Sequence, residues 1–199
     1  MILTRLEEAG KKQVRVFLDE ESFCLLYQNE CRKLHLKEEM EITQEVFEEL
    51  HEMLLHRAKL KAMSLLKYCD RTKKELQERL LRLEFPEFII EEAILYVESY
   101  GYINDEEYVR KYLEYRGSNK SRRQICQELK QKGIADCLLE YAFDTLEYDE
   151  DYILRTQIEK RIRQKGPITR ENFQKYYAYF ARKGFPGGHI VQLLKEYQQ

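Results

Sequence analysis

Basic side chains gather in two stretches of this 199-residue chain, and their chemistry suits the binding of phosphate groups. Eight lysines and arginines stand between Arg110 and Lys132 against two acidic residues, and nine stand between Arg155 and Lys183 against two. Lys and Arg hold nucleic-acid phosphates through charge, independently of base sequence and with strong dependence on salt. A single charge run is more often a solvated helix face, and the second run shifts the balance toward binding. The residues predicted to contact DNA phosphates or an acidic partner surface are Arg110, Arg116, Lys120, Arg122, Arg123, Lys130, Lys132, Lys160, Arg161, Arg163, Lys165 and Arg170.

No group of residues in the sequence has the spacing of a catalytic or metal centre. The four histidines are scattered, and His51 and His56 stand five apart, off the i,i+4 face that a zinc-binding helix uses. The five cysteines form no CxxC pair, and their odd number favours reduced thiols in a reducing compartment. No Ser/His/Asp or Cys/His arrangement stands out. We therefore predict a protein that is not an enzyme and has no catalytic residues, metal or cofactor.

The overall charge is close to neutral, with 34 basic and 36 acidic residues, so no domain-wide basic field is available. The charges are nevertheless segregated, because residues 1–57 hold thirteen acidic and eight basic residues while both basic stretches lie further along the chain. No apolar run reaches the length of a membrane-spanning helix. These features predict a soluble, cytoplasmic protein whose C-terminal half faces a polyanion or an acidic partner.

Helices must position these cations, because the chain repeats a helical pattern with a period of about fifty residues. Glu84, Gly133 and Gly184 occupy equivalent positions between two apolar helical stretches, where glycine suits a left-handed helix C-cap. Glutamate at that position should cost on the order of 1 kcal/mol. Capping boxes precede the first two copies, at Thr72-x-x-Glu75 and Ser121-x-x-Gln124. The core positions in register are Leu80, Leu129 and Phe180; Ile90, Leu139 and Ile190; and Ala93, Ala142 and Leu193.

Three copies predict a mainly α, elongated tandem array of three three-helix, helix-turn-helix-like repeats. Before them, short apolar runs within residues 1–42 predict a small N-terminal β-meander-like segment. Residues 43–57 predict a connecting helix that is capped by Thr43 and broken near His56–Arg57. The three repeats are expected at residues 58–100, 101–148 and 149–199.

The third copy differs from the other two in ways that predict local structure. Thr169 stands further ahead of its glycine than the caps of the earlier copies do, which predicts that this helix is about one turn longer. In the aromatic stretch that follows, helical spacing places Tyr176 and Phe180 in the core. Tyr177 or Tyr179 is the better candidate for a surface role, such as stacking on a base.

Four further motifs follow one another along the chain in a fixed order and spacing. They are Asp70-Arg71-Thr72-x-x-Glu75-Leu76, Tyr100-Gly101-Tyr102-Ile103-Asn104-Asp105-Glu106-x-Tyr108, Ile125-x-x-Glu128-Leu129-x-x-Lys132-Gly133-Ile134, and Lys183-Gly184-Phe185 followed by Ile190. In these motifs the sequence resembles the bacterial RecX family. Val14-x-Val16-Phe17-Leu18-Asp19 also resembles the strand region that precedes the repeats in longer members, so the resemblance spans nearly the whole chain.

The resemblance implies a non-enzymatic modulator that binds the RecA recombinase on single-stranded DNA, either along the filament groove or at its growing end. On this basis we predict a monomeric negative regulator of RecA, acting in recombination, DNA repair and the SOS response, with weak contacts to DNA phosphates. A DNA-binding transcriptional regulator is the alternative, with the helix at 121–132 in the major groove, and it predicts tight, sequence-selective duplex binding. A third possibility, an adaptor that binds only protein, predicts no salt-sensitive DNA affinity.

Overall fold

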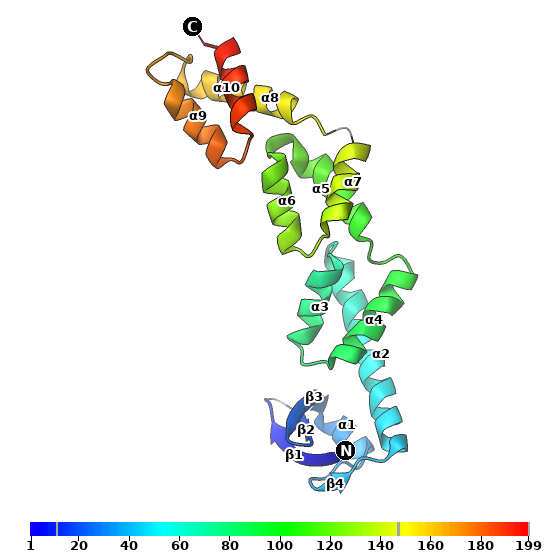
Figure 1. The fold of residues 1–199 in the computed structure, drawn as a ribbon. Coiled ribbons are helices and arrows are strands. Elements are labelled where there is room, and N and C mark those ends of the chain that lie inside the picture. The colour runs from blue at the N-terminus through cyan, green and yellow to red at the C-terminus, as the bar shows by residue number, and fades with distance from the viewer. Residues whose placement is uncertain (11, 147, 199) are drawn as a thin grey trace. The chain divides into compact units, whose positions relative to one another are not determined.

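The computed structural model describes residues 1–10, 12–146 and 148–198 and shows a mainly helical chain with a small N-terminal antiparallel sheet (Figure 1). The chain forms two compact units, Met1–Asn104 and Asp105–Gln199. The first unit has one continuous core, whereas the second has two core clusters, one around Leu129 and one around Phe180. The predicted fold class, helical repeats after a small β segment, is confirmed.

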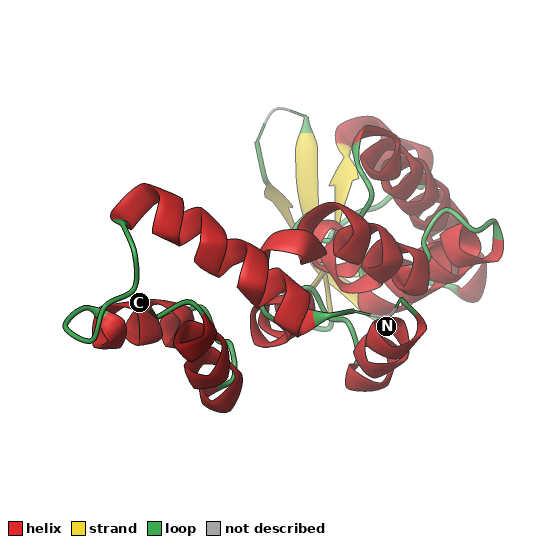
Figure 2. Ribbon diagram, turned by 90° about the horizontal axis from the view of Figure 1, so that it is seen from above, coloured by secondary structure: helices red, strands yellow, loops and turns green. Residues whose placement is uncertain are grey.

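The sheet of the first unit, whose strands are yellow in Figure 2, has the strand order β3-β2-β1-β4, and every neighbouring pair is antiparallel. Its strands and the helix that follows β3 are β1 (Ile2–Glu8), β2 (Gln13–Leu18), β3 (Glu21–Tyr27), α1 (Gln28–Lys33) and β4 (Met40–Glu41). Alternate residues face the core, and Leu3, Val16 and Leu26 are fully buried. The three predicted apolar runs form β1 to β3. Strand β4 has only two residues, too few to give a strand pattern in the sequence.

A single long helix, α2 (Gln44–Tyr68), connects the sheet to the first repeat. Thr43 caps it as predicted, since the amide of Val46 donates to the Thr43 hydroxyl. The expected break near His56–Arg57 is wrong, because the helix passes through these residues without interruption. Its buried side chains continue at helical spacing across that point, at Leu50, Leu54, Ala58 and Ala62. The expected boundary at residue 57 therefore falls inside α2, and the five-part division of the chain stays a prediction.

Each repeat consists of helices joined by a tight turn between the second and the third. The helices after α2 are α3 (Lys73–Leu81), α4 (Glu87–Ser99), α5 (Asp105–Arg116), α6 (Arg122–Gln131), α7 (Asp136–Thr145), α8 (Glu150–Lys165), α9 (Phe173–Arg182) and α10 (Gly187–Glu196), with a 3-10 turn η1 (Gly117–Asn119) between α5 and α6. Both capping boxes form as predicted, with Thr72 and Ser121 fully buried. All nine core positions named from the repeat are buried.

The turn residues Glu84, Gly133 and Gly184 all have left-handed backbones, with φ of 58°, 87° and 85°. In each turn the next amide donates back across the end of the helix, for example from Phe185 to the carbonyl of Phe180 at 3.3 Å. This bond satisfies a carbonyl that the helix leaves unpaired. It also buries the aromatic or aliphatic side chain that follows the turn.

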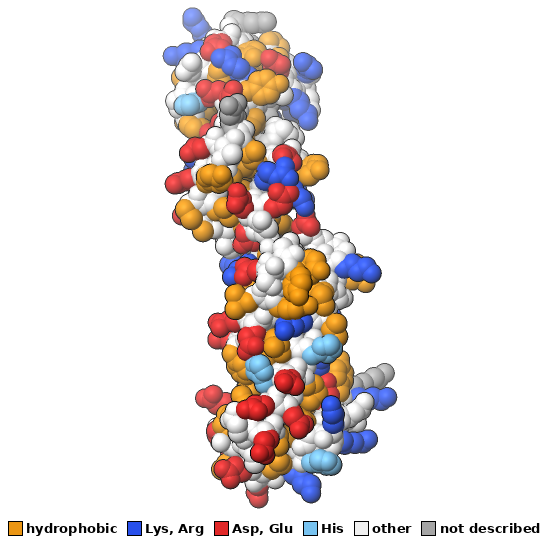
Figure 3. Space-filling model, turned by 90° about the vertical axis from the view of Figure 1, so that its right-hand side faces the viewer, with side chains coloured by type: hydrophobic (Ala, Val, Ile, Leu, Met, Phe, Trp, Pro, Cys, Tyr) orange, Lys and Arg blue, Asp and Glu red, His pale blue; other side chains and the backbone are white. Residues whose placement is uncertain are grey.

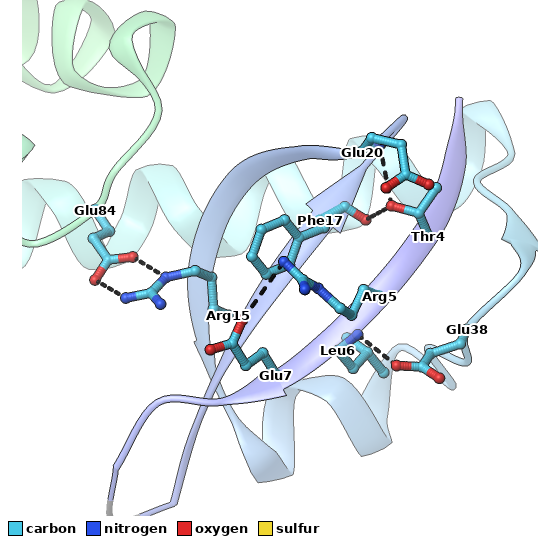
Figure 4. Close-up of polar contacts among 9 residues, drawn as sticks. All are labelled: Thr4, Arg5, Leu6, Glu7, Arg15, Phe17, Glu20, Glu38 and Glu84. Atoms are coloured by element: carbon cyan, nitrogen blue, oxygen red, sulfur yellow. Dashed lines mark hydrogen bonds and ion pairs between the residues drawn. The ribbon is translucent and has the colours of Figure 1, made fainter.

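Glu84 occupies a left-handed turn because its carboxylate binds the sheet. Both of its oxygens accept hydrogen bonds from the Arg15 guanidinium on β2, at 2.7 and 2.8 Å (Figure 4). A bidentate Arg–carboxylate pair is stronger than a single-bonded one and fixes geometry. The contact joins residues 69 positions apart and offsets the backbone cost that the sequence predicts at this turn.

The helix α9 is not one turn longer than its counterparts, so the prediction based on Thr169 is wrong. It has 10 residues, the same number as α6. The residues ahead of it form a separate turn, in which the side chain of Asn172 accepts a hydrogen bond from the Thr169 amide at 2.8 Å. The Asn172 side chain also donates to the carbonyl of Pro167. These two bonds hold the residues before Phe173 in a turn, so they do not extend the helix.

In the second unit, the turn between α9 and α10 packs on the start of α6. The Ser121 hydroxyl donates to the carbonyl of Lys183 at 2.6 Å while accepting from the Gln124 amide. A Cβ at Gly184 would lie 2.9 Å from the Ser121 oxygen and 3.2 Å from Cβ of Arg123. Glycine is therefore required here both by the backbone angle and by the close approach.

We expect Gly184→Ala to lower the free energy of unfolding of the second unit by about 1–2 kcal/mol, the cost of a left-handed alanine, and by more where Ser121 must move. Gly188→Ala is the matched control, because no atom lies within 4 Å of a Cβ at that position in α10. Hydrogen exchange of the α10 amides in the full chain measures both effects. Equal protection in the two variants would contradict this account of the turn.

We expect Glu84→Gly to be less harmful than Glu84→Ala, since both lose the Arg15 pair but only alanine keeps the left-handed strain. The difference in unfolding free energy should be about 1 kcal/mol.

Hydrogen bonds from Arg15 lower the pKa of Glu84. The pair therefore stabilises above the ordinary carboxyl pKa of about 4.3 and loses its effect as the pH falls through the folded-state value. On acidification the unfolding curves of Glu84→Ala and Arg15→Met should accordingly approach wild type, whereas Glu84→Gly, which lacks the left-handed strain of wild type, should become more stable than wild type.

Candidate nucleic-acid interface

Two members of the first basic stretch are neutralised by carboxylates of their own repeat. Arg110 on α5 pairs with Glu107 and Glu114, one helical turn away on either side. Hydrogen bonds from Arg110 hold the pKa of Glu107 below its ordinary range. Lys130 on α6 lies 2.6 Å from a carboxylate oxygen of Asp136 at the start of α7. These cations present little uncompensated charge to a ligand.

Lys120 has a structural role, because it is half-buried and holds the η1 turn to α6. Its ammonium donates to the Tyr112 hydroxyl at 2.8 Å and to Glu128 at 2.6 Å. Tyr112 also donates to the same carboxylate. These hydrogen bonds lower the pKa of Glu128, so the group stays ionised and the network stays closed at neutral pH.

Other cations of the first stretch lie on aromatic rings. The guanidinium of Arg122 lies 4.6 Å from the centroid of Phe143, and that of Arg116 lies 5.7 Å from Tyr112. The ammonium of Lys132 lies 5.5 Å from the centroid of Tyr108. An aromatic face holds a cation in place without cancelling its charge, so Arg116 and Arg122 remain attractive to anions.

The second basic stretch lies on α8, in the loop that follows it and on α9. Arg161 stacks on Tyr179 of α9, with 3.5 Å between the guanidinium carbon and the ring centroid. Tyr176 and Phe180 are buried, which confirms their predicted place in the core. Arg163 lies 3.9 Å from Glu159 and is highly exposed, so this pair is weak.

Apart from Lys132, the candidate cations therefore fall into a paired and an unpaired group. The paired ones are Arg110, Lys120, Lys130 and Arg163. Within residues 1–10, 12–146 and 148–198, no carboxylate forms an ion pair with Arg116, Arg122, Arg123, Lys160, Arg161, Lys165 or Arg170. We call these seven residues the open cations. All of them belong to the second unit.

The fold brings the two basic stretches together inside this unit. The amide of Arg122, at the start of α6, donates to Glu150 at the start of α8 at 2.8 Å. Asn119 of η1 lines the same pocket, about 130 Å³ in volume, as Lys160 and Arg161 of α8. Lys183 also lines this pocket. It belongs to the second basic stretch but was not among the predicted site residues, and only its position in that stretch could have indicated it.

Acidic side chains gather over the sheet end of the first unit on the face shown in Figure 3, in keeping with the acidic excess of residues 1–57. The described residues contain no group of three or more His, Cys, Asp and Glu side chains that could hold a metal ion. In the same residues, no helix combines the length and apolar character needed to cross a bilayer. All five cysteines are free thiols, and burial raises the pKa of Cys24, which keeps that thiol unreactive.

Comparison with known proteins places these repeats in one family. Residues 58–96 match the family model described as the first three-helix domain of RecX, and residues 104–142 match its second three-helix domain. A regulatory protein RecX of Bacillus pumilus is 30% identical over 201 residues, covering 96% of this chain and 74% of the relative. The chain belongs to the RecX family. Another relative, the regulatory protein RecX of Clostridioides difficile, is 27% identical and covers 98% of this chain and 95% of its own length.

Solved RecX structures have the same fold. The crystal structure of RecX from Lactobacillus salivarius matches with a TM-score of 0.64 and 26% identity, covering 73% of this chain and 97% of its own. A second crystal structure of a regulatory protein RecX covers 98% of both chains with a TM-score of 0.65. At 19% identity, this second match shows the shared fold alone.

We expect loss of open cations to weaken single-stranded DNA binding and to reduce its salt dependence, whereas loss of paired cations should change neither. The two matched triple variants remove the same total charge. They are Lys160→Gln/Lys165→Gln/Arg170→Gln for the open cations and Arg110→Gln/Lys130→Gln/Arg155→Gln for the paired ones, since Arg155 on α8 forms a close ion pair with Glu196 while the pair of Arg163 is weak.

Fluorescence anisotropy of a labelled oligonucleotide across a sodium chloride series measures the slope of log affinity against log salt. Each lost phosphate contact should reduce this slope by about 0.7, or by up to about 2 for the first variant. Equal slopes for both variants would show that net charge, and not the open cations, governs binding.

Proposed function

We propose that this RecX family member is a negative regulator of RecA that binds the RecA–DNA filament and limits its extension and activity in recombination, DNA repair and the SOS response. Family membership supports the regulatory role, because the curated relatives carry the name regulatory protein RecX. The observation that carries the contact with the filament is the set of open cations in the second unit. A filament on single-stranded DNA offers both phosphates and protein surface to such a set.

In the proposed mechanism the protein acts as a cytoplasmic monomer, and its repeats contact RecA protomers while the open cations contact DNA phosphates. Phosphate contacts carry no sequence information, which suits a regulator that must act on any filament. Their strength is modest and falls with salt, so free DNA is bound weakly. Contacts to RecA supply the remaining affinity and direct the protein to filaments.

The packing of α6 disfavours the alternative of a helix-turn-helix transcriptional regulator. A recognition helix contacts base edges with its N-terminal residues. Here the start of α6 is occupied, because fully buried Ser121 bonds to the carbonyl of Lys183 and the Arg122 amide bonds to Glu150. Insertion of α6 into the major groove would require the turn at Gly184 to move away.

The test is ATP hydrolysis by the cognate RecA on single-stranded DNA, with this protein added from far below equimolar to equimolar amounts. We expect the rate to fall. Inhibition at substoichiometric amounts would favour a block at the growing filament end, and inhibition only near equimolar amounts would favour occupation of the groove. An unchanged rate at every ratio would refute the regulation of RecA.

The two triple variants above separate the role of the cations from general effects of charge. We expect the open-cation variant to need several-fold more protein for half-maximal inhibition, and the paired-cation variant to resemble wild type. Melting curves of both variants should match wild type, since none of the six residues is buried. Equal inhibition by both variants would remove the open cations from the mechanism.

A further inference from the structure

The second unit contains a small pocket, lined by α8, α9 and the η1 turn, that the regulation of RecA does not by itself explain. Its volume is about 130 Å³, well below the range of about 300–1,000 Å³ for sites that hold whole nucleotides or cofactors. A single tetrahedral anion suits this size better. The pocket is lined by three cations and by neutral polar side chains, and no carboxylate is among them.

The electrostatic environment of the pocket is set by Lys160, Arg161 and Lys183. Neither Lys160 nor Arg161 has an ion-pair partner in the part of the chain that the structure describes. The ring of Tyr179 holds both Arg161, at 3.5 Å, and the Lys183 ammonium, at 5.2 Å. Stacking on this ring orients the cations but leaves their charge uncancelled, as a binding site for an anion requires.

Two buried donors at the pocket have no acceptor among the residues described. Gln157 is only 8% exposed, and its carbonyl oxygen accepts from Lys183 at 2.6 Å. That bond fixes the amide so that its NH₂ group must find another acceptor, and no described residue provides one. The Nε–H of Arg161 is buried and lacks an acceptor in the same way. Roughly nine in ten buried polar groups in proteins have a hydrogen-bond partner, so two donors without one at the same pocket indicate an acceptor that binds there.

We propose that this pocket binds one phosphate group, with Gln157, Arg161 and Lys183 as its principal ligands and Lys160 at its mouth. A phosphate oxygen can accept from several donors at once, and its charge is matched by three cations. The proposal deepens the proposed function, because a phosphodiester of the DNA strand in the filament is one source of such a group. Free inorganic phosphate is the other source, and the experiment distinguishes the two.

The first measurement is a ¹⁵N–¹H NMR titration of the full chain with inorganic phosphate, at ionic strength held constant with chloride. We expect saturable shifts of the Gln157 side-chain amide and the Arg161 Nε–H. A second titration uses a thymidine oligonucleotide without terminal phosphates. Shifts of the same two signals in both titrations would assign the pocket to the DNA backbone, and shifts with phosphate alone would assign it to the free anion. Signals that respond to neither ligand would overturn the proposal.

Gln157→Met tests the buried donor, because methionine has a similar length and removes the amide. We expect phosphate to raise the melting temperature of the wild-type protein and of the control Gln192→Met, which alters an exposed glutamine on α10. In Gln157→Met the phosphate affinity should fall at least tenfold. An equal phosphate effect in all three proteins would place the anion elsewhere.

These measurements use no RecA, so their failure leaves the proposed regulation intact. Failure of the ATP hydrolysis test would likewise leave the phosphate pocket standing, with the free anion or a different nucleic acid as its ligand.

Discussion

The left-handed turn between the second and third helix of each repeat is the constraint on which the rest of the structure depends. It stands at Glu84, Gly133 and Gly184 and sends the chain back so that two amphipathic helices can share a core. The bond across the turn, 3.0 Å from the Ile134 amide to the Leu129 carbonyl in the second repeat, satisfies the helix end. The side chain after the turn then becomes buried, which adds the hydrophobic contact typical of this motif.

The same turn also forms contacts outside its own helices. In the first repeat Glu84 has a strained left-handed backbone, and its carboxylate binds the Arg15 guanidinium of the sheet. In the third repeat Gly184 carries no side chain and comes close enough to the start of α6 for Ser121 to bond with Lys183. This second contact joins two repeats into one unit. It also places the Lys183 side chain beside the cations of α8, and the fold thereby assembles a basic site from distant parts of the sequence.

The repeat, its caps and its core could be predicted from the sequence because they are set by local spacing. The ion pairs of Arg110 could also be inferred from the sequence, since Glu107 and Glu114 stand at the i,i+3 and i,i+4 spacings that form helix ion pairs. The role of Glu84 was not, because its partner lies 69 residues away and only the tertiary fold brings them together. Gln157 likewise has no signal in the sequence, since one glutamine on a charged helix is ordinary until burial and the Lys183 bond are known. Unpaired cations can be recognised only once every carboxylate has been placed.

We propose that the chain recognises RecA and DNA together, as a filament, with the open cations on the DNA side. The most direct measurement is sedimentation of the labelled chain with RecA filaments assembled on single-stranded DNA with a slowly hydrolysed ATP analogue, compared with the same DNA alone and with RecA alone. We expect at least tenfold tighter binding to the filament than to either component at physiological salt. Equal binding to DNA with and without RecA would contradict it.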